Sequence, residues 1–125
     1  MKIILATDLK NGISKNGRIP WYRPQDLSFF KKITIQTKLP NKINAVIMGR
    51  KTWETLPNKF LPNRINIVLT RKPDLFSRYQ NSHLIFAKSI DDAERIISYI
   101  SRVENIWIIG GADINKEVFK KKSEN

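Results

Sequence analysis

Residues 45–54 have the sequence AVIMGRKTWE, in which a short apolar run leads into a glycine and two cations. A continuous apolar run of this length is typical of a strand that other elements cover on both faces. The glycine lets a ligand approach the backbone, the start of a helix offers free N–H groups, and Arg50 and Lys51 add positive charge. The stretch therefore predicts a strand over 43–48, a short helix around 53–56 and a turn between them that suits a phosphate.

Strand-like and helix-like segments alternate along the rest of the chain. Further apolar runs predict strands over residues 2–7, 65–70, 83–87 and 106–109. Apolar residues at helical spacing predict helices over residues 24–34, 89–100 and 113–119. Ser89 with Asp92 three positions later resembles a capping box at the start of the second helix. This alternation predicts a single α/β domain over residues 1–125, with a mainly parallel central sheet and the opening strand in its interior.

Composition excludes several classes of protein. The chain has 125 residues, no cysteine and one histidine, so it offers no disulfide framework, no Cys-containing zinc site and no histidine cluster. We expect no bound metal. Apolar runs fall far short of the roughly 18 residues of a membrane-spanning helix, and no signal-peptide pattern follows Lys2. The sequence therefore predicts a cytoplasmic protein without a membrane partner.

The charge of the chain is strongly positive. Lys and Arg number 23 against 11 Asp and Glu, for a formal charge of +12, which attracts polyanions in a nonspecific way. The basic residues are, however, scattered from Lys2 to Lys122 and form no concentrated stripe. We therefore interpret the charge as compositional bias, or as suited to small anionic ligands, and expect no specific nucleic-acid partner.

Anion-friendly turns follow three of the predicted strands. In parallel sheets ligands bind at the carboxyl ends of the strands, so these turns meet at one edge. Besides the turn at Gly49, residues 70–72 place a hydroxyl beside two cations, and residues 110–112 form a Gly-Gly-Ala turn that a pyrophosphate can approach. Each turn alone is more often structural, and no G-x-G-x-x-G follows the first strand. Together they predict a site for a dinucleotide with an extra phosphate, in a family other than the Rossmann dehydrogenases.

Two charged residues are candidates for substrate chemistry. Asp26 lies beside an apolar helix face, between Trp21 and the side chains of Leu27 and Phe30. It either complements the helix dipole or stands at the mouth of an apolar pocket, where it pairs with an amidine-like ring edge and helps deliver a proton. Arg64 is either an exposed cation or a bidentate clamp for a carboxylate.

Five blocks of sequence, in order, resemble the dihydrofolate reductase family. They are residues 19–21, 24–31, 46–54, 61–71 and 106–111, and the M-G-R-x-T-W-E block is highly specific. The resemblance implies a dihydrofolate-reductase-like three-layer sandwich. It also implies hydride transfer from NADPH to 7,8-dihydrofolate, giving tetrahydrofolate for one-carbon metabolism, with antifolates as plausible inhibitors and a monomer as the expected state.

The resemblance further implies roles for individual residues. Asp26 would hydrogen-bond the pterin and promote protonation of the ring nitrogen beside the carbon that receives hydride, and Trp21 would hold a water next to it. Arg64 would bind the glutamate carboxylate of the substrate. The other implied substrate-binding residues are Ile4, Ala6, Leu27, Phe30, Thr52, Leu61 and Ile109. The implied cofactor-binding residues are Ala6, Ile13, Gly49, Arg50, Lys51, Thr52, Leu69, Thr70, Arg71, Gly110, Gly111 and Ala112, of which Arg50, Thr70 and Arg71 would receive the 2′-phosphate.

Family members continue through three more strands, the first of which pairs with the opening strand. The resemblance therefore implies that this chain is C-terminally incomplete and that its opening strand is an apolar sheet edge. Two alternative functions stay open. One is a riboflavin-pathway pyrimidine reductase, against which Trp21 and Asp26 speak. The other is an inactive remnant that acts as a nucleotide- or polyanion-binding module through the +12 charge.

Overall fold

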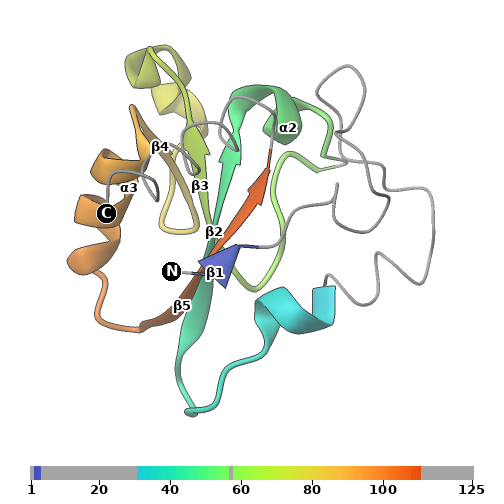
Figure 1. Ribbon diagram of the computed structural model, residues 1–125. Helices are drawn as coiled ribbons and strands as arrows, with labels where there is room; N and C mark the ends of the chain where they lie inside the picture. The colour runs from blue at the N-terminus through green and yellow to red at the C-terminus, as the bar shows by residue number, and fades with distance from the viewer. Residues whose placement is uncertain (1, 4–30, 57, 111–125) are drawn as a thin grey trace.

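The computed structural model describes residues 2–3, 31–56 and 58–110 (Figure 1). Residues 31–35 are helical. The other elements are β1 (Lys2–Ile3), β2 (Ile43–Gly49), α2 (Arg50–Glu54), β3 (Ile65–Leu69), the 3-10 helix η3 (Pro73–Tyr79), β4 (Leu84–Ala87), α3 (Ile90–Ser98) and β5 (Val103–Gly110). The expected helix over 113–119 and most of that over 24–34 lie outside the described residues.

The strands form one sheet in the order β1-β5-β2-β3-β4, and every strand pair is parallel. The expected α/β class with a parallel sheet is confirmed. β1 pairs with β5 through Ile3 and Ile108 and lies at the edge of the described sheet. The apolar pattern of residues 2–7 predicted an interior strand, whereas the resemblance implied an edge strand.

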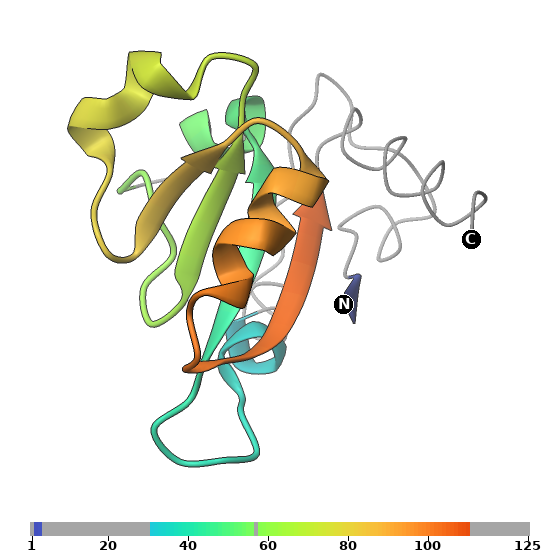
Figure 2. The ribbon, with the colours of Figure 1, turned by 90° about the vertical axis from the view of Figure 1, so that its left-hand side faces the viewer.

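Both faces of the sheet are covered, which explains the continuous apolar runs. α3 lies against one face, and residues 31–35 lie on the other side of the sheet (Figure 2). Alternate residues of β2 serve the two faces, since Ile47 packs in the cluster under α3 and Met48 in the cluster with α2. Each fully buried aliphatic side chain of this kind contributes about 1.5–3 kcal/mol to folding. The two apolar layers therefore stabilise the sheet up to the carboxyl ends of its strands.

Two element boundaries differ from the sequence-based expectation. α2 begins at Arg50, three residues before the helix expected at 53–56, because Gly49 adopts an extended backbone as its N-cap. β5 begins at Val103 instead of residue 106. Its polar residue Asn105 interrupts the apolar pattern, yet its amide donates to Asn44 Oδ1 at 3.1 Å, so a side chain on β2 satisfies it. The 3-10 helix η3 was not expected.

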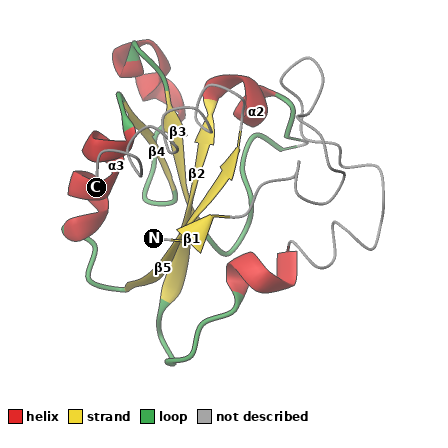
Figure 3. Cartoon of the chain, viewed as in Figure 1, coloured by secondary structure: helices red, strands yellow, loops and turns green. Residues whose placement is uncertain are grey.

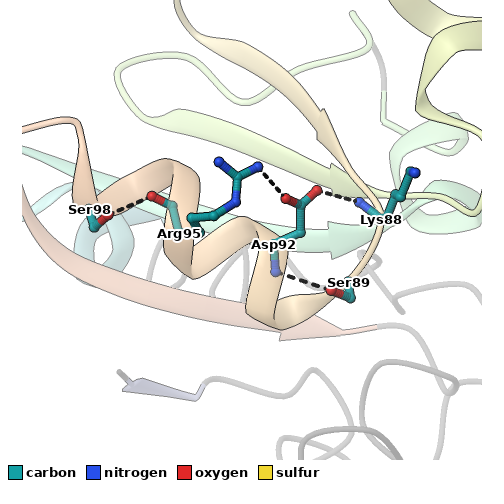
Figure 4. A network of polar contacts seen from close by, with 5 residues as sticks. All are labelled: Lys88, Ser89, Asp92, Arg95 and Ser98. Atoms are coloured by element: carbon teal, nitrogen blue, oxygen red, sulfur yellow. Dashed lines mark hydrogen bonds and ion pairs between the residues drawn. The ribbon is translucent and has the colours of Figure 1, made fainter.

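The N-terminus of α3 carries the expected Ser89 cap (Figure 4). Ser89 Oγ accepts the amide of Asp92 at 3.1 Å. The reciprocal bond of a capping box is shifted by one residue, because Asp92 Oδ2 accepts the amide of Lys88 at 3.0 Å. Arg95 Nη2 donates to Asp92 Oδ1 at 2.6 Å, and Ser98 Oγ donates to the Arg95 carbonyl at 2.6 Å. The bonds of Ser89 and Asp92 fix the start of α3 directly after the end of β4.

Candidate functional site

The register of the sheet brings the predicted turns to one edge. Gly49 lies beside Leu69, Met48 lies beside Gly110, and Leu69 lies beside Ala87. Since the strands run in the same direction, β2, β3 and β5 all end at this edge (Figure 3). Gly49, Leu69 and Gly110, at which the three predicted turns begin, are therefore neighbours in space.

The turn after β2 presents one half-buried cation, one exposed cation and a buried hydroxyl. Arg50 Nη1 lies 2.6 Å from Glu54 Oε1, and Lys51 is exposed. Thr52 is fully buried, and its Oγ1 has no hydrogen-bond partner among the described residues. Leaving a buried hydroxyl unpaired costs about 1–3 kcal/mol, so a polar ligand atom that reached Thr52 would recover that energy. The turn therefore suits an anionic group.

The turn after β3 offers a hydroxyl and two cations, as its sequence predicted. The Thr70 amide donates to the Ala87 carbonyl at 2.9 Å, which fixes the start of the turn against β4. Thr70 Oγ1 accepts the Lys72 amide at 3.3 Å, so its own proton is available to an acceptor. Arg71 and Lys72 are exposed. A phosphate at this edge would meet a hydroxyl donor and two positive side chains.

Gly110 ends β5 with a left-handed backbone, at φ +116°. A Cβ at this position would meet nothing within 4 Å among the described residues, so conformation and not space requires the glycine. The remainder of the turn, Gly111 and Ala112, lies outside the described residues.

Arg64 is buried, which contradicts the alternative of an exposed cation. Its side chain is held on one side: Nε donates to the Pro62 carbonyl at 2.9 Å, and Nη1 donates to Thr34 Oγ1 at 3.0 Å. Burial lowers the pKa of Arg64 to about 10, so the group keeps its charge at neutral pH. No carboxylate of the described residues pairs with Arg64. A buried cation with no counter-ion among the described residues favours an anionic ligand.

Of the remaining site residues that the sequence predicted, some are described by the structure and others are not. Leu61 is half-buried beside Asn66, and Ile109 and Leu69 are buried on opposite faces of the sheet. The predicted residues that lie outside the described positions are Ile4, Ala6, Ile13, Trp21, Asp26, Leu27, Phe30, Gly111 and Ala112.

Three buried polar residues of the site were missed by sequence reasoning. Asn66 brackets the loop before β3: its Oδ1 accepts the Leu61 amide at 2.7 Å, and its Nδ2 donates to the carbonyls of Leu61 and Arg64 at 2.9 and 3.0 Å. Asn44 and Thr34 are also fully buried. Asparagine is depleted in strands, so Asn44 and Asn66 beside apolar runs were a signal that these side chains bond to the backbone.

The described residues contain neither a membrane-spanning helix nor a metal-binding cluster. Within residues 2–3, 31–56 and 58–110, no helix is long and apolar enough to cross a bilayer. The same residues contain no group of three His, Asp or Glu side chains that could hold a metal ion.

Comparison with known families bears on the whole chain. The family model described as dihydrofolate reductase matches residues 1–124. The chain belongs to the dihydrofolate reductase family. The dihydrofolate reductase of Candida albicans is 41% identical over 118 residues, which are 93% of this chain and 59% of the relative. A bifunctional dihydrofolate reductase-thymidylate synthase of Arabidopsis thaliana is 39% identical over 127 residues, covering 98% of this chain and 24% of the relative.

Solved structures agree with the family. The dihydrofolate reductase of Schistosoma mansoni superimposes with a TM-score of 0.73 at 34% identity, covering 95% of this chain and 63% of the other. The chain thus spans less than two thirds of the length of these dihydrofolate reductases and about a quarter of the bifunctional relative.

Proposed function

We propose that the protein reduces 7,8-dihydrofolate to tetrahydrofolate with NADPH as hydride donor, as a single domain over residues 1–125. The observation that supports this proposal is that β2, β3 and β5, which precede the three predicted anion-binding turns, end at one edge of the sheet in a chain of the dihydrofolate reductase family. Relatives in Candida albicans and Schistosoma mansoni bear the name dihydrofolate reductase. The product would serve one-carbon metabolism in the cytoplasm, and we expect a monomer that antifolates inhibit.

The turns fit the phosphates of NADPH. Arg50, Thr70 and Arg71 supply the charge and the hydroxyl that a 2′-phosphate requires, and NADH lacks that phosphate. Lys51 suits the pyrophosphate, as does the buried hydroxyl of Thr52, which has no hydrogen-bond partner among the described residues. The remaining proposed cofactor contacts are Ala6, Ile13, Gly49, Leu69, Gly110, Gly111 and Ala112. NADPH, when bound, supplies the hydride, while the protein supplies orientation and a proton.

The substrate is held at its two ends in this proposal. Arg64, buried and cationic, binds the glutamate carboxylate at one end. At the other end Asp26 bonds the amino-pyrimidine edge and promotes protonation of the ring nitrogen, with a water held by Trp21. The pocket between them is formed by Ile4, Ala6, Leu27, Phe30, Thr52, Leu61 and Ile109.

A direct assay tests the proposal. Purified protein is mixed with NADPH and dihydrofolate, and NADPH oxidation is followed by the loss of reduced-nicotinamide absorbance. We expect oxidation that depends on dihydrofolate, is slower with NADH and is strongly reduced in Asp26→Asn at neutral pH. NADPH oxidation that is the same with and without dihydrofolate would refute the proposed activity.

A further inference from the structure

The described residues fix Arg64 on one side of its guanidinium. Its Nε and Nη1 donate to Pro62 and Thr34, while Nη2 makes no hydrogen bond to the described part of the chain. A long arginine side chain loses rotamer entropy when it is ordered. The groups that order it before a ligand arrives therefore raise its affinity for that ligand.

Thr34 is the side chain that holds the guanidinium. It lies in the helical residues 31–35 and is fully buried. Its Oγ1 accepts from Arg64 Nη1 at 3.0 Å and lies 3.5 Å from the Lys31 carbonyl, to which its own proton points. A threonine hydroxyl that donates back along its helix presents its lone pairs outward, here to Arg64.

Asn44 in turn holds the main chain of Thr34. Its Nδ2 donates to the carbonyls of Thr34 and Gln36 at 2.9 and 2.8 Å, so it fastens the end of the helical segment to β2. Its Oδ1 accepts the backbone amide and the side-chain amide of Asn105, both at 3.1 Å, which ties the same point to β5. Both donors and both acceptor positions of this buried amide are used. The sheet therefore fixes where the Thr34 hydroxyl lies.

We propose that Thr34 and Asn44 are positioning residues for Arg64: Asn44 holds Thr34, and Thr34 holds the guanidinium with Nη2 turned to the ligand carboxylate. This inference rests on the proposed function, because it assigns Arg64 a carboxylate ligand. A purely structural role for these two residues makes a different prediction. It lowers stability and leaves the preference for a carboxylate-bearing ligand unchanged.

The test uses two ligands of similar shape, one with carboxylates and one with uncharged amides. Folate carries two glutamate carboxylates, and folate diamide carries amides in their place. Equilibrium binding is measured for wild type, Thr34→Val, Thr34→Ser and Arg64→Met. Thr34→Val keeps the shape of the side chain and removes the hydroxyl. We expect this variant to bind folate about 5- to 20-fold more weakly than wild type, and the diamide less than about 2-fold more weakly. Thr34→Ser keeps the hydroxyl and retains wild-type discrimination.

A double-mutant cycle shows whether Thr34 acts through Arg64. In the Arg64→Met background, Thr34→Val should lower the affinity for folate by less than about 2-fold, because the guanidinium that Thr34 orients is absent. Asn44→Ala should reduce discrimination between the two ligands by about 2- to 10-fold. Asn81→Ala is the matched control: its Oδ1 accepts the His83 amide in an exposed loop before β4, and its loss should leave discrimination unchanged.

The possible failures are distinguishable. If wild type binds folate and its diamide equally, Arg64 binds no carboxylate, and the proposed substrate contact fails together with the inference. If wild type and Arg64→Met differ in discrimination but Thr34→Val matches wild type, the substrate contact stands and the positioning role is wrong. An effect of Thr34→Val that persists at full size in Arg64→Met also overturns the positioning role.

Discussion

Arg50 Nη1 and Glu54 Oε1 lie 2.6 Å apart, one helical turn from each other on α2. The two side chains are 39% and 43% exposed. An exposed pair of this kind contributes only about 0–1 kcal/mol to stability. A phosphate dianion can therefore displace the Glu54 carboxylate from Arg50, or bind Arg50 together with it. The carboxylate nevertheless competes for the cation that we propose for the 2′-phosphate.

Removing either proposed phosphate cation should change cofactor preference. Arg50→Ala and Arg71→Ala should each weaken NADPH binding by about 1.5–3 kcal/mol and leave NADH binding nearly unchanged, because only NADPH carries the 2′-phosphate. Titration of each variant with both cofactors measures this difference. Equal losses for NADPH and NADH would contradict the proposed phosphate site.

Removing the competing carboxylate should have the opposite effect. Glu54→Gln should strengthen NADPH binding by about 0.2–1 kcal/mol at low salt, with a smaller gain at high salt, since screening weakens both the pair and the repulsion. The measurement is the NADPH dissociation constant at two ionic strengths. Glu94→Gln, in the middle of α3, is the control because it changes net charge equally; the same gain in that variant would assign the effect to net charge.

The catalytic assignment of Asp26 predicts a pH-dependent defect. Asp26→Asn should depress hydride transfer strongly at neutral pH and less at acidic pH, where the substrate arrives already protonated. Single-turnover rates across that pH range test this. A neutral-pH rate equal to wild type would remove Asp26 from the mechanism.

The cap of α3 predicts a pH dependence of stability. The hydrogen bond from the Lys88 amide, followed by that from Arg95, holds the pKa of Asp92 below its ordinary value of 3.8. Because the folded-state pKa is the lower one, this stabilisation is fully present above about pH 3.8 and is lost as the pH falls through the folded-state pKa.

Asp92→Asn should therefore lower the free energy of unfolding by about 0.5–1.5 kcal/mol at neutral pH, and the difference from wild type should shrink in strong acid. Urea unfolding at neutral and acidic pH gives both values. Asp74→Asn, which removes an exposed carboxylate from η3, serves as the control and should show little effect. A deficit that is the same at both pH values would show that the charge of Asp92 does not contribute.

Trp53 should be a major source of stability at the end of β2. It is 3% exposed, its Nε1 donates to the Lys59 carbonyl at 2.6 Å, and it makes edge contacts with the rings of Phe76, Tyr79 and Phe86. Trp53→Ala should cost about 3–5 kcal/mol of unfolding free energy. Tyr99→Ala, at a position 80% exposed, should cost less than about 0.5 kcal/mol in the same denaturation experiment. Similar losses in the two variants would show that the Trp53 cluster contributes little.

The sequence by itself determined the elements whose residues interact locally or repeat with a fixed period. The apolar runs of β2 and β3 predicted strands that are covered on both faces. Successive residues of a strand point to opposite faces, so a continuous apolar run needs an apolar layer on each face. Ser89 and Asp92 predicted the start of α3, because a cap is completed within four residues. That β2, β3 and β5 end at one edge of the sheet follows from their parallel direction.

Only the tertiary structure decided the state of the buried polar groups. Arg64 and Thr34 are 30 residues apart, and Asn44 and Asn105 are 61 apart, so no local pattern pairs them. Whether Arg64 is an exposed cation or a buried one depends on which side chains pack over it, and the sequence left that choice open. Hydrogen bonds between distant residues depend on strand order and register, and a buried polar group must find its partner wherever the packed chain brings one within reach.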